Sequence, residues 1–99
     1  MAKFRKKPIV IEAEQFHLGQ DLPAGVQVVL YDSHSSPPSF IMPKGDLDPS
    51  RDANMGFGIQ TLEGWHLVTN GDWIITGVEG EKYPCKSGIF AATYEEVSV

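Results

Sequence analysis

The side chains best suited to chemistry lie in the last third of the chain, where aromatic residues and lysines alternate. Trp73 precedes Glu79-Gly80, a tight-turn pair, and Lys82 and Lys86 follow it. A hairpin with this two-residue turn would place Trp73, Lys82 and Lys86 on one face. A flat aromatic ring beside two ammonium groups can stack on a nucleobase and bind its phosphate. A core tryptophan with lysines extended around it explains the same pattern, so both interpretations stay open.

Four further residues extend this candidate binding set. Trp65 can add a second stacking platform, and Tyr83 can add a hydroxyl group. Lys6 or Lys7, from the basic start of the chain, can supply an outer phosphate contact. We therefore predict a ligand site built from Trp65, Lys82, Tyr83 and Lys86 around Trp73.

Catalytic and metal-binding patterns are weak in this sequence. A Cys85–His66 dyad would need two hairpins to stack, and the expected register places Cys85 on an apolar face instead. Asp46, Asp48 and Asp52 lack the spacing of a calcium loop. The chain has neither a phosphate-binding loop of the Walker type nor a metal-ligand spacing of histidines. We expect no catalytic residues, no metal and no cofactor.

Length and charge set the broad class. The 99 residues predict one domain, 1–99, with a formal charge of −5. Four of the eight cations lie in the first seven residues, so a basic tip precedes an acidic body. An acidic body repels a nucleic-acid backbone. No apolar run reaches the ~20 residues of a membrane helix, and no signal-peptide core follows the basic tip. We expect a cytosolic protein with a free thiol at Cys85.

Short runs of β-branched and aromatic residues, separated by turn signals, predict a chain of short strands. Residues 44–58 hold three glycines and one proline and are expected to form a long loop. A two-residue turn at Glu63-Gly64 is expected, and Ser87 is expected to cap a short helix over 89–94. The expected strands are 9–16, 26–31, 40–42, 59–62, 65–68, 73–78 and 81–86.

Strands joined by tight turns favour a mainly β fold. We predict a small antiparallel barrel or sandwich-like meander with one short C-terminal helix. A helix packed against one face of the sheet makes an α+β fold the alternative.

Two segments resemble a widespread group of small bacteriophage and prophage proteins. Arg5 to Phe16 is similar to their opening pattern RKKP-I-V-I-E-A-x-Q-F, and residues 61–97 are similar to their ending, TLEG-W-H, then GDWIITGV-x-GE-x-YPCKP-x-IF-x-TYE. The match covers about half of the chain. It also resembles the short domain called PGDYG, although Asn70-Gly71-Asp72-Trp73 replaces Pro-Gly-Asp-Tyr. Ser87 stands where proline is usual and Ala91 where an acid is usual, and residues 17–60 carry no resemblance.

The resemblance implies a phage protein acting in the cytoplasm of the infected bacterium. By analogy with other small phage proteins, we expect a non-enzymatic counter-defence protein that sequesters a small nucleotide signal of the cyclic-nucleotide type. A homo-oligomer would enclose such a ligand better than one short chain. The alternative is an inhibitor whose acidic body occupies a basic surface on a host defence protein or nucleic-acid-binding factor.

Overall fold

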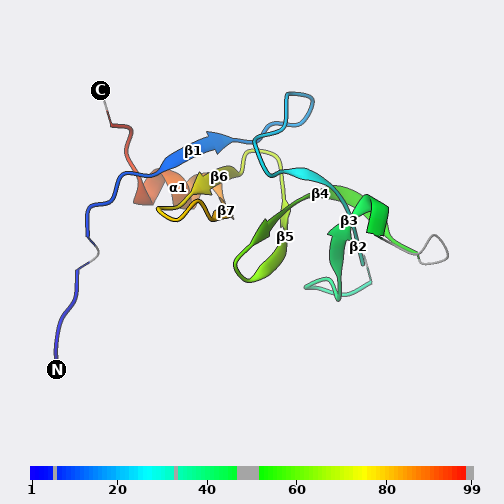
Figure 1. Cartoon of the computed structure of the whole chain (residues 1–99), viewed down its shortest axis with the longest axis horizontal. Coiled ribbons are helices and arrows are strands. Elements are labelled where there is room, and N and C mark those ends of the chain that lie inside the picture. Colours follow the sequence, from blue (N-terminus) through cyan, green and yellow to red (C-terminus); the bar gives the residue numbers. More distant parts are fainter. Residues whose placement is uncertain (6, 33, 47–51, 98–99) are drawn as a thin grey trace.

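Two antiparallel β-sheets and one C-terminal helix make up the computed structural model, which describes residues 1–5, 7–32, 34–46 and 52–97 (Figure 1). One sheet has the strand order β1-β6-β7 and the other β3-β2-β4-β5. The prediction of a mainly β fold with one short C-terminal helix is confirmed. The elements are β1 (Glu12–Gln15), β2 (Gln27–Tyr31), β3 (Ile41–Pro43), a 3-10 turn (Lys44–Asp46), β4 (Asn54–Thr61), β5 (Gly64–Val68), β6 (Trp73–Thr76), β7 (Lys82–Cys85) and α1 (Ser87–Thr93).

The main hydrophobic core joins the two sheets. Ile74 of β6 contributes from the three-stranded sheet, and Ile59 and Val68 contribute from the four-stranded sheet. Phe16, fully buried at the end of β1, packs against Phe57 with ring centroids 5.2 Å apart. Burial of these side chains is the main force holding the sheets together.

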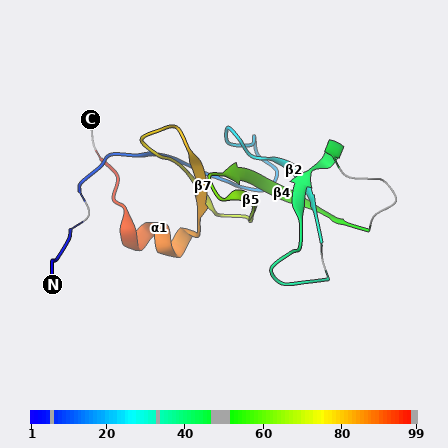
Figure 2. The same cartoon turned by 60° about the horizontal axis from the view of Figure 1, so that its bottom comes forward.

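A second layer covers the opposite face of the three-stranded sheet. Helix α1 lies against this face and is seen below β7 in Figure 2. Phe90 of α1 stacks on Trp73 with ring centroids 4.3 Å apart and planes 7° apart. Lys86, and not Ser87, is the N-cap, and it provides no side-chain cap bond, so the predicted cap was wrong. A seven-residue helix is not stable alone, so α1 depends on this stacking.

The expected loop over residues 44–58 is partly wrong, because β4 begins at Asn54 and runs for eight residues. The glycines that indicated a loop are instead required by the sheet. A Cβ atom on Gly58 would lie 2.9 Å from Val29 Cγ1, and one on Gly56 would lie 3.0 Å from Tyr31 Cε1. These strand glycines let side chains of β2 lie across the neighbouring strand.

The predicted register of β6 and β7 was wrong by one residue. The connection is a three-residue loop, Val78–Gly80, closed by a Gly77 N–H that donates to the Glu81 carbonyl at 2.8 Å. Gly80 supplies the positive φ of 81° that such a loop needs. A one-residue slip exchanges the faces. Trp73 therefore shares a face with Tyr83 and Cys85, whereas Lys82 lies on the opposite face with Thr76.

The β4–β5 turn also differs from the prediction. Its two turn residues are Leu62 and Glu63, and Thr61 pairs with Gly64. The Thr61 Oγ1 atom accepts the Glu63 N–H at 3.0 Å and donates to the Gly64 carbonyl at 2.9 Å. The polar threonine side chain therefore shifts the turn by one residue, and the faces of both strands stay as predicted.

The described residues before β1, 1–5 and 7–11, form an extended segment, which we call the arm. The strand predicted from Ile9 begins only at Glu12, because β6 ends at Thr76, the partner of Glu12. The arm leads away from the sheets to a distant N-terminus (Figures 1 and 2). The radius of gyration is 15.7 Å, above the ~13 Å typical of compact chains of this length.

Candidate functional site

A buried carboxylate organises the turn between β5 and β6. Asp72 is 3% exposed, and its Oδ2 atom accepts the backbone N–H of Thr69 at 2.8 Å and the Thr69 hydroxyl at 3.1 Å. The Gly71 N–H donates to the Phe16 carbonyl at 2.8 Å, and the Phe16 N–H donates to the Asp72 carbonyl at 2.7 Å. The turn is thereby bonded to the end of β1. The residues of the Asn-Gly-Asp-Trp segment therefore have a structural role in this turn.

Lys86 belongs to this same turn. Its ammonium donates to the Thr69 hydroxyl at 2.6 Å and lies 3.3 Å from Asp72 Oδ1. The pairing joins the end of β7 to the turn before β6. Lys86 was predicted to contact a ligand phosphate, but in this structure its charge is compensated by Asp72.

The two tryptophans lie in separate places. One ring face of Trp73 is covered by Phe90, so this indole anchors the helix. Trp65 of β5 pairs with Gln60, on the face of the four-stranded sheet away from Ile59 and Val68. The structure does not bring the two predicted stacking platforms together.

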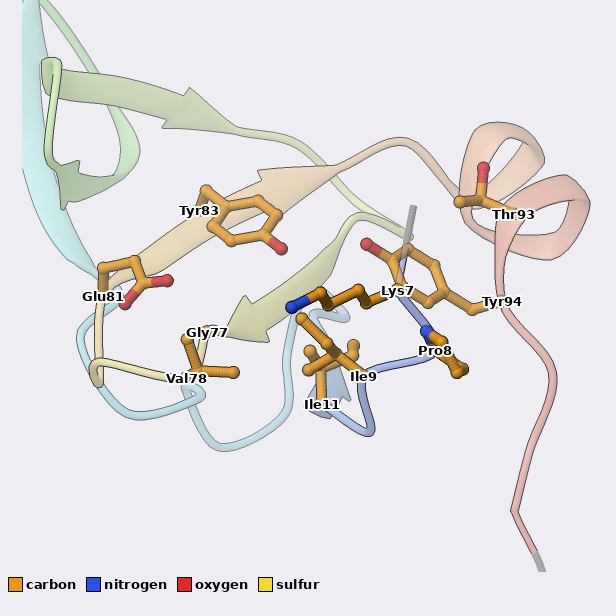
Figure 3. A pocket seen from close by; sticks show the side chains of 10 residues that line it. All are labelled: Lys7, Pro8, Ile9, Ile11, Gly77, Val78, Glu81, Tyr83, Thr93 and Tyr94. Atoms are coloured by element: carbon orange, nitrogen blue, oxygen red, sulfur yellow. The ribbon is translucent and has the colours of Figure 1, made fainter. Parts of the chain in front are cut away.

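A cavity lies between the arm, the β6–β7 loop and the end of α1 (Figure 3). Its volume is about 300 Å³, at the lower end of the range for small-molecule sites. Ile9, Ile11 and Val78 form an apolar side, and Tyr83, Tyr94 and Glu81 supply polar groups. We call this space the arm cavity; it is lined by Lys7, Pro8, Ile9, Ile11, Gly77, Val78, Glu81, Tyr83, Thr93 and Tyr94.

Lys7 places a positive charge inside the arm cavity. Its side chain reaches from the arm toward the β6–β7 loop, with the ammonium between the tyrosine hydroxyls and Val78 (Figure 3). Across the described parts of the chain, the only ion pair is that of Lys86 with Asp72. The Lys7 charge therefore faces the cavity without a carboxylate partner among these residues.

Two tyrosines form the wall opposite the arm. A hydrogen bond between the Tyr83 and Tyr94 side chains joins the hairpin to the end of α1 at the cavity. Burial, together with this bond, raises the pKa of Tyr83 to about 12. The Tyr83 phenol therefore stays protonated at neutral pH and can form hydrogen bonds with a ligand.

Glu81 closes the far end of the arm cavity. Its Oε2 atom accepts the Glu79 N–H at 3.0 Å, which stabilises the loop. A Cβ atom on Gly77 would overlap the flexible end of the Glu81 side chain, so the glycine leaves room for the carboxylate in this position. The loop sequence thus fixes an acceptor at the cavity edge.

A neighbouring cavity of about 430 Å³ lies between β7 and the β4–β5 turn. It shares Glu81 and Tyr83 with the arm cavity, and it also contains Lys82 and His66. The Lys82 ammonium donates to the Thr76 hydroxyl at 2.6 Å. The two cavities therefore adjoin each other across Glu81 and Tyr83, whereas the Lys82 ammonium is bonded to Thr76, which lines neither of them.

The predicted site residues divide among these places. Tyr83 and Lys7 meet in the arm cavity, and Lys82 lies in the neighbouring cavity. Trp65, Trp73 and Lys86 line neither of them. Lys6 lies outside the described residues. The fold thus brings two of the predicted ligand-binding residues together and places the other described ones elsewhere.

Sequence reasoning missed Tyr94 and Glu81. The Tyr83–Tyr94 bond depends on how α1 packs, and no local pattern reveals that packing. The position of Glu81 beside Gly77 follows from the three-residue loop, which the predicted two-residue turn concealed.

Cys85 and His66 do not form a pair. Cys85 shares the helix-covered face with Trp73, and its Sγ atom donates to the Lys86 carbonyl at 3.7 Å. Burial, and secondarily the charge of Asp72, raises the pKa of this thiol. His66 lines the neighbouring cavity instead. The thiol is therefore held in its protonated form at neutral pH.

The residue ranges that the structure describes contain neither a cluster of metal ligands nor a membrane-spanning helix. There, no three or more His, Cys, Asp and Glu side chains gather as metal ligands would. Asp46 and Asp52 are exposed, and Asp48 of the acidic trio lies outside these ranges. None of the helices in the same ranges has the length and apolar character required to cross a bilayer.

Comparison with known proteins gives no relative. No family model, curated protein or solved structure matches the chain.

Proposed function

We propose that this chain is a non-catalytic binding protein that sequesters a small nucleotide, with the arm cavity as its phosphate-binding site. One observation carries the proposal: the Lys7 ammonium reaches into the arm cavity and, among the described residues, has no ionic partner. A lysine in such a setting provides a charge-assisted contact for a phosphate oxygen.

The surrounding chemistry supports a nucleotide over a simple anion. Ile9 and Ile11 offer apolar contact to a base, while Tyr83 and Glu81 offer a donor and an acceptor for polar edges. The neighbouring cavity repeats the combination of a lysine with shared polar groups. A cyclic dinucleotide, with two phosphates and two bases, matches two adjoining cavities that hold one lysine each.

The biological setting is part of the proposal and rests on the sequence resemblance to small phage proteins. In the cytoplasm of an infected bacterium, such a protein would counter host defence by trapping a nucleotide signal. Trapping requires nanomolar affinity, which corresponds to about −12 kcal/mol. Stacking contributes about 1–3 kcal/mol per base, so phosphate contacts and enclosure must supply the remainder.

Isothermal titration calorimetry with cyclic mononucleotides and cyclic dinucleotides tests the proposal. We expect submicromolar binding of at least one ligand and a loss of tenfold or more in affinity with Lys7→Ala. Lys44→Ala is the matched control, because Lys44 is exposed on the 3-10 turn and lines neither cavity; it should leave affinity within twofold. Absence of binding by every nucleotide, or equal affinities in both variants, would overturn the proposed site.

A protein target is the second candidate function. Exposed Glu12 and Glu14 share one face of the edge strand β1, and the whole chain carries a charge of −5. Such a surface suits a basic, nucleic-acid-binding patch on a host factor. Support would require a partner enriched from host lysate to bind again as a purified protein. Weaker binding by a Glu12→Lys/Glu14→Lys variant would then place the contact on β1.

A further inference from the structure

The arm carries apolar side chains that this chain leaves in water. Phe4 is 94% exposed and Val10 is 75% exposed. Burying one such side chain is worth about 1.5–3 kcal/mol, so an arm held in solvent loses a large favourable term. Ile9 of the arm is also exposed, and exposed apolar side chains gathered on one segment are typical of an interaction site.

A second cavity on the arm can receive such a side chain. This groove, of about 380 Å³, runs between the arm residues Pro8–Ile11 and the end of α1 with the following segment. Phe90 and Val97 provide apolar walls, and Glu95 lies at its edge. We call it the helix groove; it differs from the arm cavity by containing Val10, Phe90, Glu95 and Val97 and by lacking Lys7.

The charges of the arm and of the helix groove are complementary. The sequence places Lys3 and Arg5 on either side of Phe4, and residues 1–11 contain no acid. At the groove, Glu95 is followed by Glu96, and both are exposed. Neither the arm cations nor these two glutamates form an ion pair within residues 1–5, 7–32, 34–46 and 52–97.

Phe4 of the same chain is poorly placed to enter this groove. Pro8 itself lines the groove, only four positions after Phe4, so the chain would have to reverse within three residues. A residue that precedes proline is restricted to extended conformations, which disfavours a turn at Lys7. Residues 1–5 lie away from α1 in both views (Figures 1 and 2).

We propose that two copies of this chain exchange arms. Phe4 of each copy inserts into the helix groove of the other, and Lys3 and Arg5 pair with Glu95 and Glu96. Because each copy both gives an arm and receives one, the contact closes with twofold symmetry. The exchange needs no nucleotide. It would also bring arm cations of one copy close to the arm cavity of the other, because both spaces share Pro8, Ile9 and Tyr94.

Sedimentation equilibrium of the full chain without nucleotide tests the exchange. We expect a dimer at micromolar concentration, weakened thirtyfold or more by Phe4→Ala and weakened by added salt. Met55→Ala is the matched control: Met55 is also exposed, at 60%, but lies in the four-stranded sheet. The Met55→Ala variant should dimerise with the same affinity as the unsubstituted protein. A monomeric parent, or a dimer unaffected by Phe4→Ala, would overturn the proposal.

Charge reversal separates the predicted pairing from a general loss of apolar contact. Lys3→Glu/Arg5→Glu and Glu95→Lys/Glu96→Lys should each weaken the dimer, while the two variants mixed should form a heterodimer. Circular dichroism should show unchanged folding in each. Failure of the mixture to associate would contradict the ionic part of the contact.

Crosslinking tests the exchange directly. In a Cys85→Ala background, Ala2→Cys protein, which keeps Lys3, Phe4 and Arg5, mixed with Val97→Cys protein should give a crosslinked heterodimer with a short bismaleimide. A Met55→Cys partner should give none. Equal crosslinking of both partners would exclude insertion at the helix groove. Dimerisation without nucleotide binding, or the reverse, would separate this inference from the proposed function.

Discussion

Lys86 and Lys7 have the same side chain but opposite surroundings. The Lys86 ammonium is paired with buried Asp72 and bonded to Thr69, in a turn that joins three strands. The Lys7 ammonium extends into an open cavity with no such partner among the described residues. The first lysine contributes to folding, whereas the second retains its capacity to bind an anion.

This contrast separates stabilising residues from binding residues. At the turn, the carboxylate, the hydroxyl and the ammonium satisfy one another, and the described chain contains no buried side-chain N or O atom that lacks a partner. The arm cavity instead exposes charged and phenolic groups beside an apolar wall. Substitutions in the turn should therefore change stability, and substitutions in the cavity should change binding.

The largest effect is expected for Asp72→Ala. The change removes three charge-assisted hydrogen bonds and leaves the Thr69 N–H without its acceptor, at a cost of about 3 kcal/mol in the free energy of unfolding. Urea denaturation followed by circular dichroism measures this cost. Asp21→Ala is the control, because Asp21 is exposed, and it should change stability by less than about 0.5 kcal/mol. A shift as small as the control's would contradict the structural role of the turn.

Phe90→Ala is expected to be next in size. The change removes the stack on Trp73 and the contact with Tyr94, whose ring centroid lies 5.0 Å from that of Phe90. We expect the free energy of unfolding to fall by about 2 kcal/mol. Hydrogen exchange should become faster in α1 but not in β4. Ile89→Ala, at an exposed helix position, is the control and should preserve protection of α1. Unchanged exchange in the Phe90 variant would show that the stack does not hold the helix.

Much of the architecture could be predicted from the sequence, because turn chemistry and alternation are local. The antiparallel strands and the C-terminal helix followed from them. The sequence did not predict which side chains share a face of the sheet. The loop Val78–Gly80 has three residues instead of two, and this places Tyr83 and Lys82 on the faces opposite to those predicted. The glycines of β4 were misread for a similar reason: their role depends on Val29 and Tyr31 in another strand.

The candidate site was predicted only in part, for a related reason. Lys7 and Tyr83 were singled out by residue type, and the fold places them in one cavity. Tyr94 reaches the same cavity because α1 packs under the hairpin, which is a tertiary event. Lys86 was chosen on the same grounds as Lys7, and only the position of Asp72 distinguishes the two lysines.

Lys86→Ala should have a smaller effect than Asp72→Ala. The Lys86 side chain is 61% exposed, so its ion pair is screened by solvent and is worth about 0.5–1 kcal/mol. The Lys86→Ala variant should keep its nucleotide affinity within twofold. The Lys7→Ala variant should instead lose affinity and keep its stability. Measuring unfolding and calorimetric affinity for both variants tests this crossover. Loss of binding in the Lys86 variant with normal folding would reverse the assigned roles.

Alkaline pH should affect the cavity wall. The folded state holds the Tyr83 proton until pH values near its pKa of about 12, whereas an unfolded tyrosine loses it near 10. The stabilising contribution is therefore complete below pH 10 and is lost as the pH rises through 12. Absorbance at the phenolate band should show one tyrosine titrating late, and Tyr83→Phe should remove that phase. A late phase that persists would assign the shift to another tyrosine.

The smallest effect is expected at Asp32, in the loop between β2 and β3. Its carboxylate accepts hydrogen bonds from the Ser39 hydroxyl, the His34 N–H and the Ser35 hydroxyl, which lower its pKa to about 2. Because the folded state favours the charged form, this contribution is present above the unfolded pKa of about 4 and disappears as the pH falls toward 2. These partners all lie in the same surface loop, so the change should be confined to the loop. NMR titration of the carboxyl carbon should show the low pKa, and Ser39→Ala should move it upward, because the Ser39 bond is the largest cause. An ordinary pKa in the parent protein would show that these bonds do not persist in solution, and that this loop, unlike the Asp72 turn, is not held by its polar side chains.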